Sequence, residues 1–502
     1  MTKNQDKKVI DHFIQTYVKN IREGSAAIFA GAGLSVGAGF VDWKELLSDV
    51  AEMLNLDINK EYDYTLLCQF YINEYQNRHH INSKILNEFA KQSKLTENHK
   101  IIAKLPIRTI WTTNYDQLLE RAFRDSGKVV DVKHNVQQLT NSIPGADVKI
   151  YKMHGDVDYP FDAILAKEQY EKYSTSHAAF IRELSAALSS KTFLFLGFSF
   201  NDPNVDHVLR LVRHSFGQNQ RNHYWIEKRK TVSTSTSTSN SNLAQSDHLD
   251  NKDNLLHEHR RQELMINELK RYGIQTILID EYDEITSILE NISMQLKNKT
   301  VFISGSISDY QSDSKNRADE EKILEFTHKL SYELIKNQYR VVNGFGLAVG
   351  SAVINGALAA IEDNPSTCSD SQLILKPFPQ LQTGTKSHVE LWQEYRQRMI
   401  ALTGISIFIA GNKYIDGKLA KGKKNDGIRS EFEISLKNSN ICIPVPMKQE
   451  SIYSSDVLFD ELLKNSSVES RDLIELLKAL GNEENSHDKA ISLIINYIKT
   501  IN

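Results

Sequence analysis

The stretch from Ala26 to Ser35, with the sequence AAIFAGAGLS, determines how the rest of the chain is interpreted. Its first five residues are apolar and predict a buried strand, which ends in Gly31-Ala32-Gly33. Glycines directly after a strand let backbone N–H groups approach a phosphate closely, because no Cβ stands in the way. The stretch therefore predicts a dinucleotide-binding turn, with a simple tight turn as the alternative.

Composition excludes several classes of protein. The chain has 502 residues, which is enough for about three domains at roughly 150 residues each. A net charge of −4 with 25% charged residues provides no basic surface, so we expect neither nucleic acid nor a membrane as a partner. No apolar run has the length of a signal peptide core or of a membrane span, and the three cysteines lie far apart. We expect a cytoplasmic protein without a zinc module or a disulfide framework.

Apolar runs that predict strands alternate with helical patterns in the first part of the chain. After the opening stretch come the runs RTIW, KIYK, TFLFL, HYWIE and QTILID. A helical and aromatic-rich segment over about 62–105 is expected to form an insert packed over the site. Strands that alternate with helices predict an α/β fold with a mainly parallel, doubly wound sheet.

The second part of the chain repeats this organisation. A Ser/Thr-rich tract over 231–254 has no apolar periodicity and predicts a flexible surface insert, followed by a charged helix at about 255–272. A second strand-and-glycine opening, TVFISGSIS, begins near residue 299, and five apolar runs then alternate with helices. We therefore expect two tandem Rossmann-like domains, at 1–290 and 300–502.

Polar motifs follow three further strands of the first domain. TTNYD ends at Asp116, MHGD contains His154, and GFS ends at Ser199. Ligands of an open parallel sheet bind outside the carboxyl ends of its strands, so these motifs and the glycine turn should converge on one crevice. Each residue alone also has a structural interpretation, because Asp116 can cap the next helix and His154 can be a buried core histidine.

The motifs GAGLS, TTNYD, MHG and GFS, in this order at strand ends, resemble those of the sirtuin family, whose members cleave NAD between nicotinamide and ribose. The resemblance covers about residues 1–285 and implies a Rossmann-type sheet with Asn114 and His154 as the catalytic residues. The NAD-binding residues that it implies are Ala30, Gly31, Ala32, Gly33, Ser35, Asp42, Asp116, Gly197 and Ser199.

The chain departs from the sirtuin pattern in three respects. It lacks the four zinc-binding cysteines of sirtuin deacylases, Thr113 stands in place of a glutamine, and Lys44 stands in place of an arginine. The resemblance then implies NAD⁺ hydrolysis to nicotinamide and ADP-ribose, with water as the acceptor and without a metal. Two alternatives remain, a sirtuin-type protein deacylase and a non-catalytic nucleotide-binding regulator. The missing cysteines argue against the first, and the retained Asn114 and His154 argue against the second.

A second constellation of glycines and charged residues lies in the C-terminal domain. Glycine turns after two strands predict a phosphate-binding site, with close helix–strand packing as the alternative. Basic residues with one carboxylate suit a ligand that is rich in phosphates and carries ribose hydroxyls. The residues predicted to bind this ligand are Gly305, Ser306, Gly344, Gly346, Gly350, Ser351, Lys376, Arg396, Asn412, Lys413 and Glu431.

This half of the chain, about 300–502, resembles the SLOG family of nucleotide-related Rossmann domains. Enzymatic relatives of that family use a turn rich in glycine and threonine before a catalytic glutamate, whereas NDGIRSEFE has one glycine and no threonine. This difference favours ligand sensing over hydrolysis. A sirtuin-like domain followed by a SLOG domain resembles the effectors of Thoeris anti-phage defence. The resemblance implies activation by a cyclic ADP-ribose isomer from a TIR-domain protein, and a homotetramer.

Overall fold

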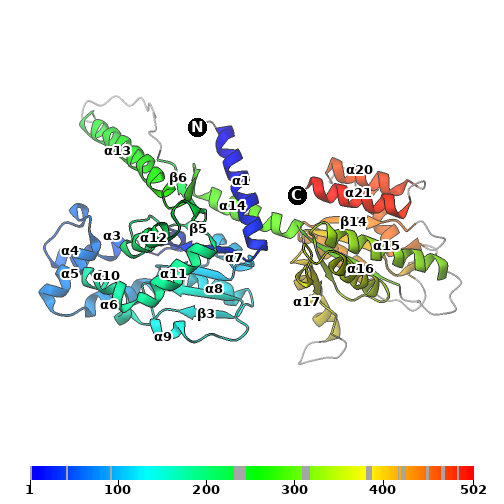
Figure 1. Cartoon of the computed structure of the whole chain (residues 1–502), viewed down its shortest axis with the longest axis horizontal. Helices are drawn as coiled ribbons and strands as arrows, with labels where there is room; N and C mark the ends of the chain where they lie inside the picture. The colour runs from blue at the N-terminus through cyan, green and yellow to red at the C-terminus, as the bar shows by residue number, and fades with distance from the viewer. Residues whose placement is uncertain are drawn as a thin grey trace. The chain divides into compact units, whose positions relative to one another are not determined.

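The protein forms two compact α/β units, Met1–Ser293 and Met294–Asn502, in a computed structural model (Figure 1). The boundary between the units falls inside helix α14 (Asp283–Asn298). Each unit has its own parallel sheet with helices, which confirms the predicted fold class. The structure describes residues 3–40, 43–90, 93–230, 245–307, 317–379, 387–415, 418–419, 426–447, 452–464, 470–482 and 486–501.

The first unit is built on a seven-stranded sheet in the order β3-β4-β2-β1-β5-β6-β7. All neighbouring strands are parallel. The strands are β1 (Ala26–Ala30), β2 (Thr109–Thr112), β3 (Val130–Lys133), β4 (Val148–Lys152), β5 (Thr192–Leu196), β6 (His223–Lys228) and β7 (Ile274–Ile279). Every residue of β1 and β5 is buried, as expected for central parallel strands that helices cover on both faces.

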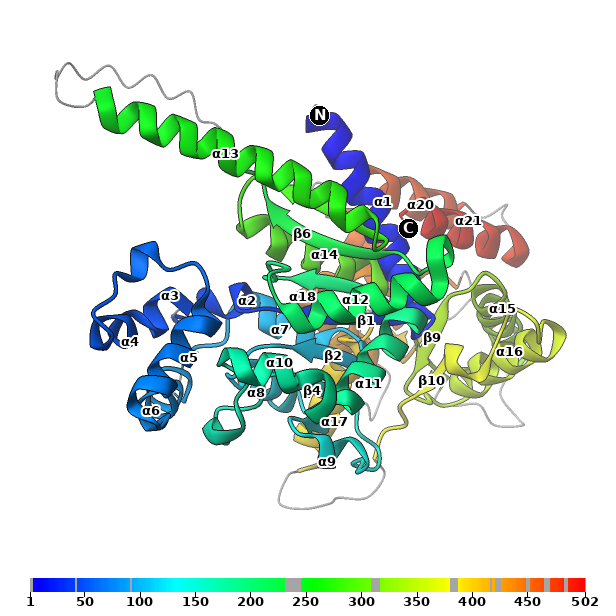
Figure 2. The same ribbon diagram turned by 60° about the vertical axis from the view of Figure 1, so that its left-hand side comes forward.

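Helices surround this sheet and also form a separate cluster beside it. Figure 2 shows α3, α4, α5 and α6 gathered together, and their apolar side chains share a core with Tyr115, Val157, Ala163, Leu165 and Ala166. The insert predicted at about 62–105 is therefore helical. The helices are α1 (Lys3–Arg22), α2 (Gly33–Val36), α3 (Trp43–Leu46), α4 (Ser48–Met53), α5 (Tyr64–Tyr75), α6 (His79–Phe89), α7 (Glu97–Lys104), α8 (Leu118–Asp125), α9 (Val136–Leu139), α10 (Lys167–Ser176), α11 (Ala178–Ser190), α12 (Pro203–Phe216), α13 (Gln245–Lys270) and α14.

Three features of this unit differ from the sequence prediction. Strand β3 was not predicted, because its four residues VDVK include two charged ones. Asp42 and the apolar residues from Leu46 to Leu54 predict a single helix, but the structure has α3 and α4, because the backbone at Leu47 leaves helical geometry with φ −105° and ψ 7°. Helix α13 begins at Gln245, ten residues before the predicted 255. Asp42 itself and residues 231–244 lie outside the described residues.

The second unit contains a five-stranded parallel sheet in the order β10-β9-β8-β11-β14. Its strands are β8 (Thr300–Ser306), β9 (Arg340–Asn343), β10 (Leu373–Leu375), β11 (Ile405–Ala410) and β14 (Ile441–Val445). They correspond to the five predicted apolar runs. A small antiparallel sheet of β12 (Lys413–Ile415), β13 (Lys418–Leu419) and β15 (Ile452–Tyr453) was not predicted, because its strands are too short to show a period.

Helices of the second unit divide between two apolar cores. One core joins the sheet to α15, α16, α18, α19, α20 and α21, and a smaller one joins it to α17 and to the other side of α18. These helices are α15 (Arg317–Lys336), α16 (Val349–Asp363), α17 (His388–Ile400), α18 (Gly427–Lys437), α19 (Ser454–Lys464), α20 (Arg471–Gly481) and α21 (His487–Thr500).

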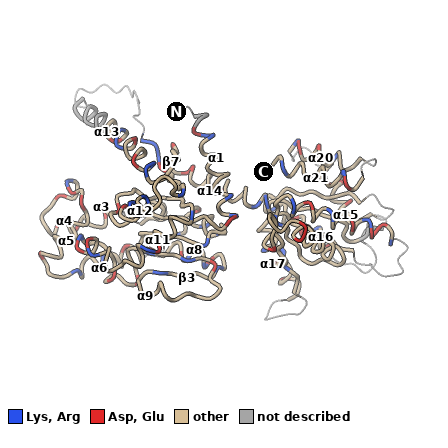
Figure 3. Tube along the Cα trace, in the orientation of Figure 1, with Lys and Arg blue, Asp and Glu red and all other residues tan. Residues whose placement is uncertain are grey.

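Surface charges of both signs are interspersed along the helices. Figure 3 shows basic and acidic segments close together along α13 and α15, where ion pairs three or four residues apart link them. Among the described residues, no helix combines the length and the apolar character that crossing a bilayer requires.

Candidate functional site

Four neighbouring strands end in one row at the centre of the first sheet. Lys152 of β4 pairs with Thr112 of β2, which pairs with Ala30 of β1, and Ala30 pairs with Leu196 of β5. The segments that follow these residues carry the motifs MHG, TTNYD, GAG and GFS. The order of the strands, which no single motif reveals, thus places the four motifs side by side.

Asn114 lies between two of these segments and is 8% exposed. Its Nδ2 donates to the carbonyl of Gly31 at 3.1 Å and to Oγ of Ser35 at 3.2 Å, and its backbone N–H donates to Oγ1 of Thr112. Its Oδ1 is buried and has no hydrogen-bond partner among the described residues. A buried acceptor without a partner costs free energy, which makes Oδ1 of Asn114 a candidate for contact with a ligand.

His154 follows the neighbouring strand and is 2% exposed. Its Nε2 lies 3.2 Å from Oδ2 of Asp202, and its Nδ1 lies 3.5 Å from the hydroxyl of Tyr170. Sequence analysis missed both partners. The motif NDPNV did carry a signal, because Asp followed by Pro marks a helix start, but it gave no indication of the histidine.

Asp202 is the N-cap of α12, and its Oδ1 accepts hydrogen bonds from the backbone N–H groups of Asn204 and Val205 at 3.0 Å. Burial alone would raise the pKa of this carboxyl. The adjacent His154 and the two backbone amides outweigh this effect and hold the pKa of Asp202 below its usual value. A charged carboxylate therefore stands beside the imidazole.

The glycines of the opening turn make a close crossing with the end of β5. Gly31 and Gly33 donate their N–H groups to the carbonyls of Leu196 and Gly197, both at 2.9 Å. A Cβ at Gly31 would lie 2.3 Å from the carbonyl oxygen of Gly197, which itself has φ +59°. These glycines are thus required for packing, and the two N–H groups predicted to face a phosphate are engaged within the protein.

The remaining predicted residues of this unit differ in their surroundings. Oδ1 of Asp116 accepts from the backbone N–H of Leu118, the first residue of α8, at 3.0 Å, while the N-cap position itself is held by Gln117. Ala30 and Ser35 are buried beside Asn114, whereas Ala32, Gly33 and Ser199 are exposed.

In the second unit, a buried carboxylate joins two predicted elements. Glu431 of α18 accepts a hydrogen bond from Oγ of Ser304 at 2.6 Å and lies 3.3 Å from Nε of Arg396. The guanidinium of Arg396 also lies over the ring of Phe378, 5.2 Å from its centroid. Burial raises the pKa of Glu431, and Ser304 and Arg396 oppose this effect. Ser304 belongs to the predicted phosphate-binding turn with Gly305 and Ser306, but its contact with Glu431 was not predicted.

The glycine turn between β9 and α16 packs directly on the end of β8. A Cβ at Gly346 would lie 2.1 Å from the carbonyl oxygen of Gly305, and one at Gly350 would lie 2.8 Å from the backbone of Phe345. Phe345 and Ala348 have φ of +61° and +62°, which is strained for residues other than glycine. Packing thus accounts for these glycines, and strain at such a turn is typical of a ligand site.

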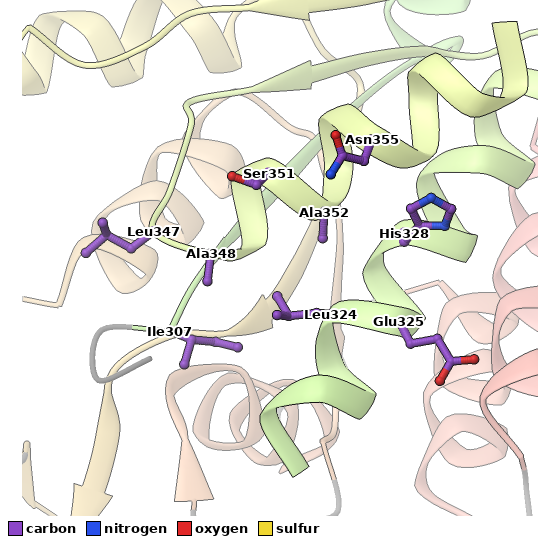
Figure 4. Close-up of a pocket in the computed structure, with 9 residues that line it drawn as sticks. All are labelled: Ile307, Leu324, Glu325, His328, Leu347, Ala348, Ser351, Ala352 and Asn355. Atoms are coloured by element: carbon purple, nitrogen blue, oxygen red, sulfur yellow. The ribbon is translucent and has the colours of Figure 1, made fainter. Parts of the chain in front are cut away.

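The other predicted residues of this unit are distributed around the sheet. Lys376 is exposed, and its backbone N–H donates to the carbonyl of Asn343. Ser351 lines a pocket of about 590 Å³ (Figure 4), together with Ile307 and Leu347 on one side and Glu325 and His328 on the other. A Cβ at Gly344 would meet the ring of Phe378. Ser306 is the last residue of β8, and Asn412 closely follows β11. The side chain of Lys413 lies outside the described residues.

Comparison with known proteins identifies both units. Residues 108–252 match the model of the SIR2-like domain, and residues 284–501 match that of the Sir2- and TIR-associating SLOG family. The chain is 45% identical over 438 residues to the NAD(+) hydrolase ThsA of Bacillus cereus (strain MSX-D12), covering 87% of each chain. It is 38% identical over 502 residues to the NAD(+) hydrolase ThsA of Enterococcus faecium, covering 99% of each chain. The chain belongs to the ThsA family.

The match to the ThsA relatives extends over both units, which confirms the predicted tandem of a sirtuin-like and a SLOG domain. A more distant relative, the defense-associated sirtuin 2 of Bacillus subtilis, is 25% identical over 217 residues, or 41% of this chain and 21% of that protein.

The described residues of this ThsA-family chain contain no candidate metal site. Within those residues, no cluster of three or more His, Cys, Asp or Glu side chains could hold a metal ion. Cys68, Cys368 and Cys442 are all buried in the apolar cores, and burial raises the pKa of the Cys68 thiol to about 12. These thiols are packing residues rather than nucleophiles.

Proposed function

We propose that this protein hydrolyses NAD⁺ to nicotinamide and ADP-ribose at the strand ends that carry Asn114 and His154. The observation that carries the proposal is the buried Oδ1 of Asn114, which is fixed by two hydrogen bonds at Nδ2 and has no partner among the described residues. A positioned acceptor of this kind suits a ribose hydroxyl or a water molecule. The ThsA relatives are named NAD(+) hydrolases, which supports this activity.

The chemistry needs few groups from the protein. The bond between nicotinamide and C1′ of the ribose breaks with its electron pair leaving on nicotinamide, which becomes neutral while positive charge develops on C1′. Water then bonds to C1′ and loses a proton. Oδ1 of Asn114 would orient this water or a ribose hydroxyl, and His154 beside the charged Asp202 would accept the proton.

The NAD-binding residues are proposed on the same basis. Ser35 contacts Asn114 directly, and Gly31 supplies the carbonyl that holds its amide. Of the others, the exposed Ala32, Gly33 and Ser199 would face the substrate, while Ala30, Gly197 and Asp116 would shape the site from within.

We also propose that the second unit binds a cyclic ADP-ribose isomer, which activates NAD⁺ hydrolysis in anti-phage defence. The buried contact of Glu431 with Arg396 and Ser304, next to a strained glycine turn, supports a ligand site there. The match to a Sir2- and TIR-associating family supports a TIR-domain protein as the source of the ligand. To move the ratio of active to inactive enzyme from 1:99 to 99:1, the ligand must bind the active state about 5.5 kcal/mol more tightly than the inactive one. In a homotetramer, several binding sites could share this difference.

Chromatographic assay of the purified full-length protein tests both proposals. We expect nicotinamide and ADP-ribose in equal amounts from NAD⁺, with a rate that rises when one cyclic ADP-ribose isomer is added. Absence of nicotinamide under every condition would contradict the hydrolase. Nicotinamide release only with an acylated peptide would indicate a deacylase instead.

A further inference from the structure

A lysine with no exposed surface lies beneath the proposed catalytic residues. Lys152 is the last residue of β4 and is 0% exposed. Its Nζ lies 2.7 Å from the carbonyl oxygen of Asp116, 3.1 Å from that of Tyr115 and 2.6 Å from Oδ2 of Asp156. A fully buried lysine is rare unless its charge is paired, so this arrangement needs an explanation.

The ammonium group has three protons, and three acceptors take them. The fourth neighbour, Oε1 of Glu120, lies 3.0 Å away but has no hydrogen-bond partner in the described part of the chain. Glu120 therefore adds a second negative charge beside the ammonium group, next to the three acceptors named above. The hydrogen-bonded group consists of Lys152, the two carbonyls and Asp156.

These acceptors belong to the two segments that carry the proposed catalytic residues. Tyr115 and Asp116 directly follow Asn114, and Asp156 lies two residues after His154. Two further hydrogen bonds join the same segments, from Val157 N–H to the carbonyl of Tyr115 and from Gln117 to Asp156. Lys152 adds to these two links by holding the carbonyls of Tyr115 and Asp116 next to Asp156.

We propose that Lys152 is a positioning residue, whose ammonium group clamps the segment after β2 to the segment after β4 and so fixes the distance between Asn114 and His154. Lys152 does not contact the substrate. This inference rests on the proposed NAD⁺ hydrolysis, since it assigns a role to a residue near that site.

The charges of the cluster are consistent with a clamp. Burial disfavours the charge of Asp156, but Lys152 opposes this effect and holds the pKa of Asp156 below its usual value. Burial raises the pKa of Glu120, with Lys152 opposing. Both carboxyls thus interact with the same ammonium group, and against the effect of burial each of them raises the pKa of Lys152.

Two variants separate stability from positioning. Lys152→Met leaves two buried carboxyls without a counter-charge, so we expect a Tm lower by on the order of 10 °C. The triple variant Lys152→Met/Glu120→Gln/Asp156→Asn removes all three charges and should recover most of this loss. It cannot restore the hydrogen bonds to the two carbonyls, and kcat should stay roughly 100-fold below wild type with KM within about threefold.

A neighbouring strand offers a matched control. Lys133 ends β3 as Lys152 ends β4, is 3% exposed, and lies 2.7 Å from Oδ1 of the equally buried Asp131. The structure shows no contact from this pair to the segments that carry Asn114 and His154 among the described residues. The Lys133→Met/Asp131→Asn protein should therefore retain kcat within about twofold.

Amide hydrogen exchange provides a measurement that does not depend on activity. We expect faster exchange over residues 113–117 in the triple variant and wild-type exchange there in the control. Unchanged exchange in a triple variant with recovered Tm would overturn the clamp, as would wild-type kcat. If the triple variant does not recover its Tm, the single variant Glu120→Gln provides the test. It leaves the hydrogen bonds of Lys152 in place, so the clamp requires this variant to keep the wild-type kcat. A wild-type protein that releases no nicotinamide would contradict the proposed function. The hydrogen-exchange comparison would then still test the clamp.

Discussion

The Nε2 atom of His154 lies 3.2 Å from Oδ2 of Asp202, while the other oxygen of the same carboxylate caps helix α12. One side chain thus connects a proposed catalytic residue to the start of a helix. Asparagine caps helices about as well as aspartate, so the two roles can be separated by a single substitution.

Asp202→Asn should lower kcat at least ~10-fold, because the imidazole loses the charged group that orients it and stabilises its protonated form. The Tm should stay near that of wild type, since the cap remains. Asp202→Ala should in addition lose about 1 kcal/mol of stability. Steady-state kinetics and thermal unfolding measure both effects, and wild-type turnover by Asp202→Asn would show that His154 does not depend on this carboxylate.

Asn114→Ala should reduce NAD⁺ cleavage roughly 10²- to 10³-fold, because it removes one positioned polar group from the reacting centre. His154→Ala should behave similarly. Asn135 provides a control, since it follows the edge strand β3 and its side chain caps helix α9. Asn135→Ala should keep wild-type activity, measured as nicotinamide release. An active, well-folded Asn114→Ala protein would contradict the assignment.

Glu227 of β6 makes the stability of the first unit depend on pH. Burial raises its pKa to about 7, with Lys230 opposing. The stability associated with a raised pKa is fully present below the ordinary pKa of glutamate and is lost as the pH rises through about 7. Glu227→Gln should therefore match wild type near pH 4 and exceed it by about 1–2 kcal/mol at pH 8, after a discount for partial exposure. Urea unfolding at both pH values measures this, and an equal difference at each would refute it.

Glu431→Gln should weaken activation by a cyclic ADP-ribose isomer at least ~10-fold, because charge-assisted hydrogen bonds from Arg396 and Ser304 hold the carboxylate in place. Basal NAD⁺ hydrolysis should be unchanged. Glu433 lies on the same helix but is exposed, so Glu433→Gln is the matched control. Isothermal titration and activation curves compare the two proteins. Equal activation of both would place the ligand site elsewhere in the second unit.

Some predicted residues proved to have roles that the motif alone could not show. Gly31 and Gly33 suggested a phosphate-binding turn, yet their N–H groups are engaged by Leu196 and Gly197. Sequence spacing cannot show this, because the partners are the last residue of β5 and the residue after it, more than 160 residues along the chain. Strand β3 and the small sheet of the second unit were missed for another reason, since a run of two to four residues carries no reliable hydrophobic period.

The sequence by itself determined the α/β class, the central strands and the polar residues at their ends, because buried parallel strands require apolar runs and because strand ends are where polar groups can remain accessible. Only the tertiary structure decided which residues meet. The pairing of β4 with β2 places His154 beside the Asn114 segment, and the helix start at Asp202 supplies the partner of His154. Lys152 could not be interpreted before that pairing was known, since an ammonium group is stable in a core only when distant acceptors converge on it.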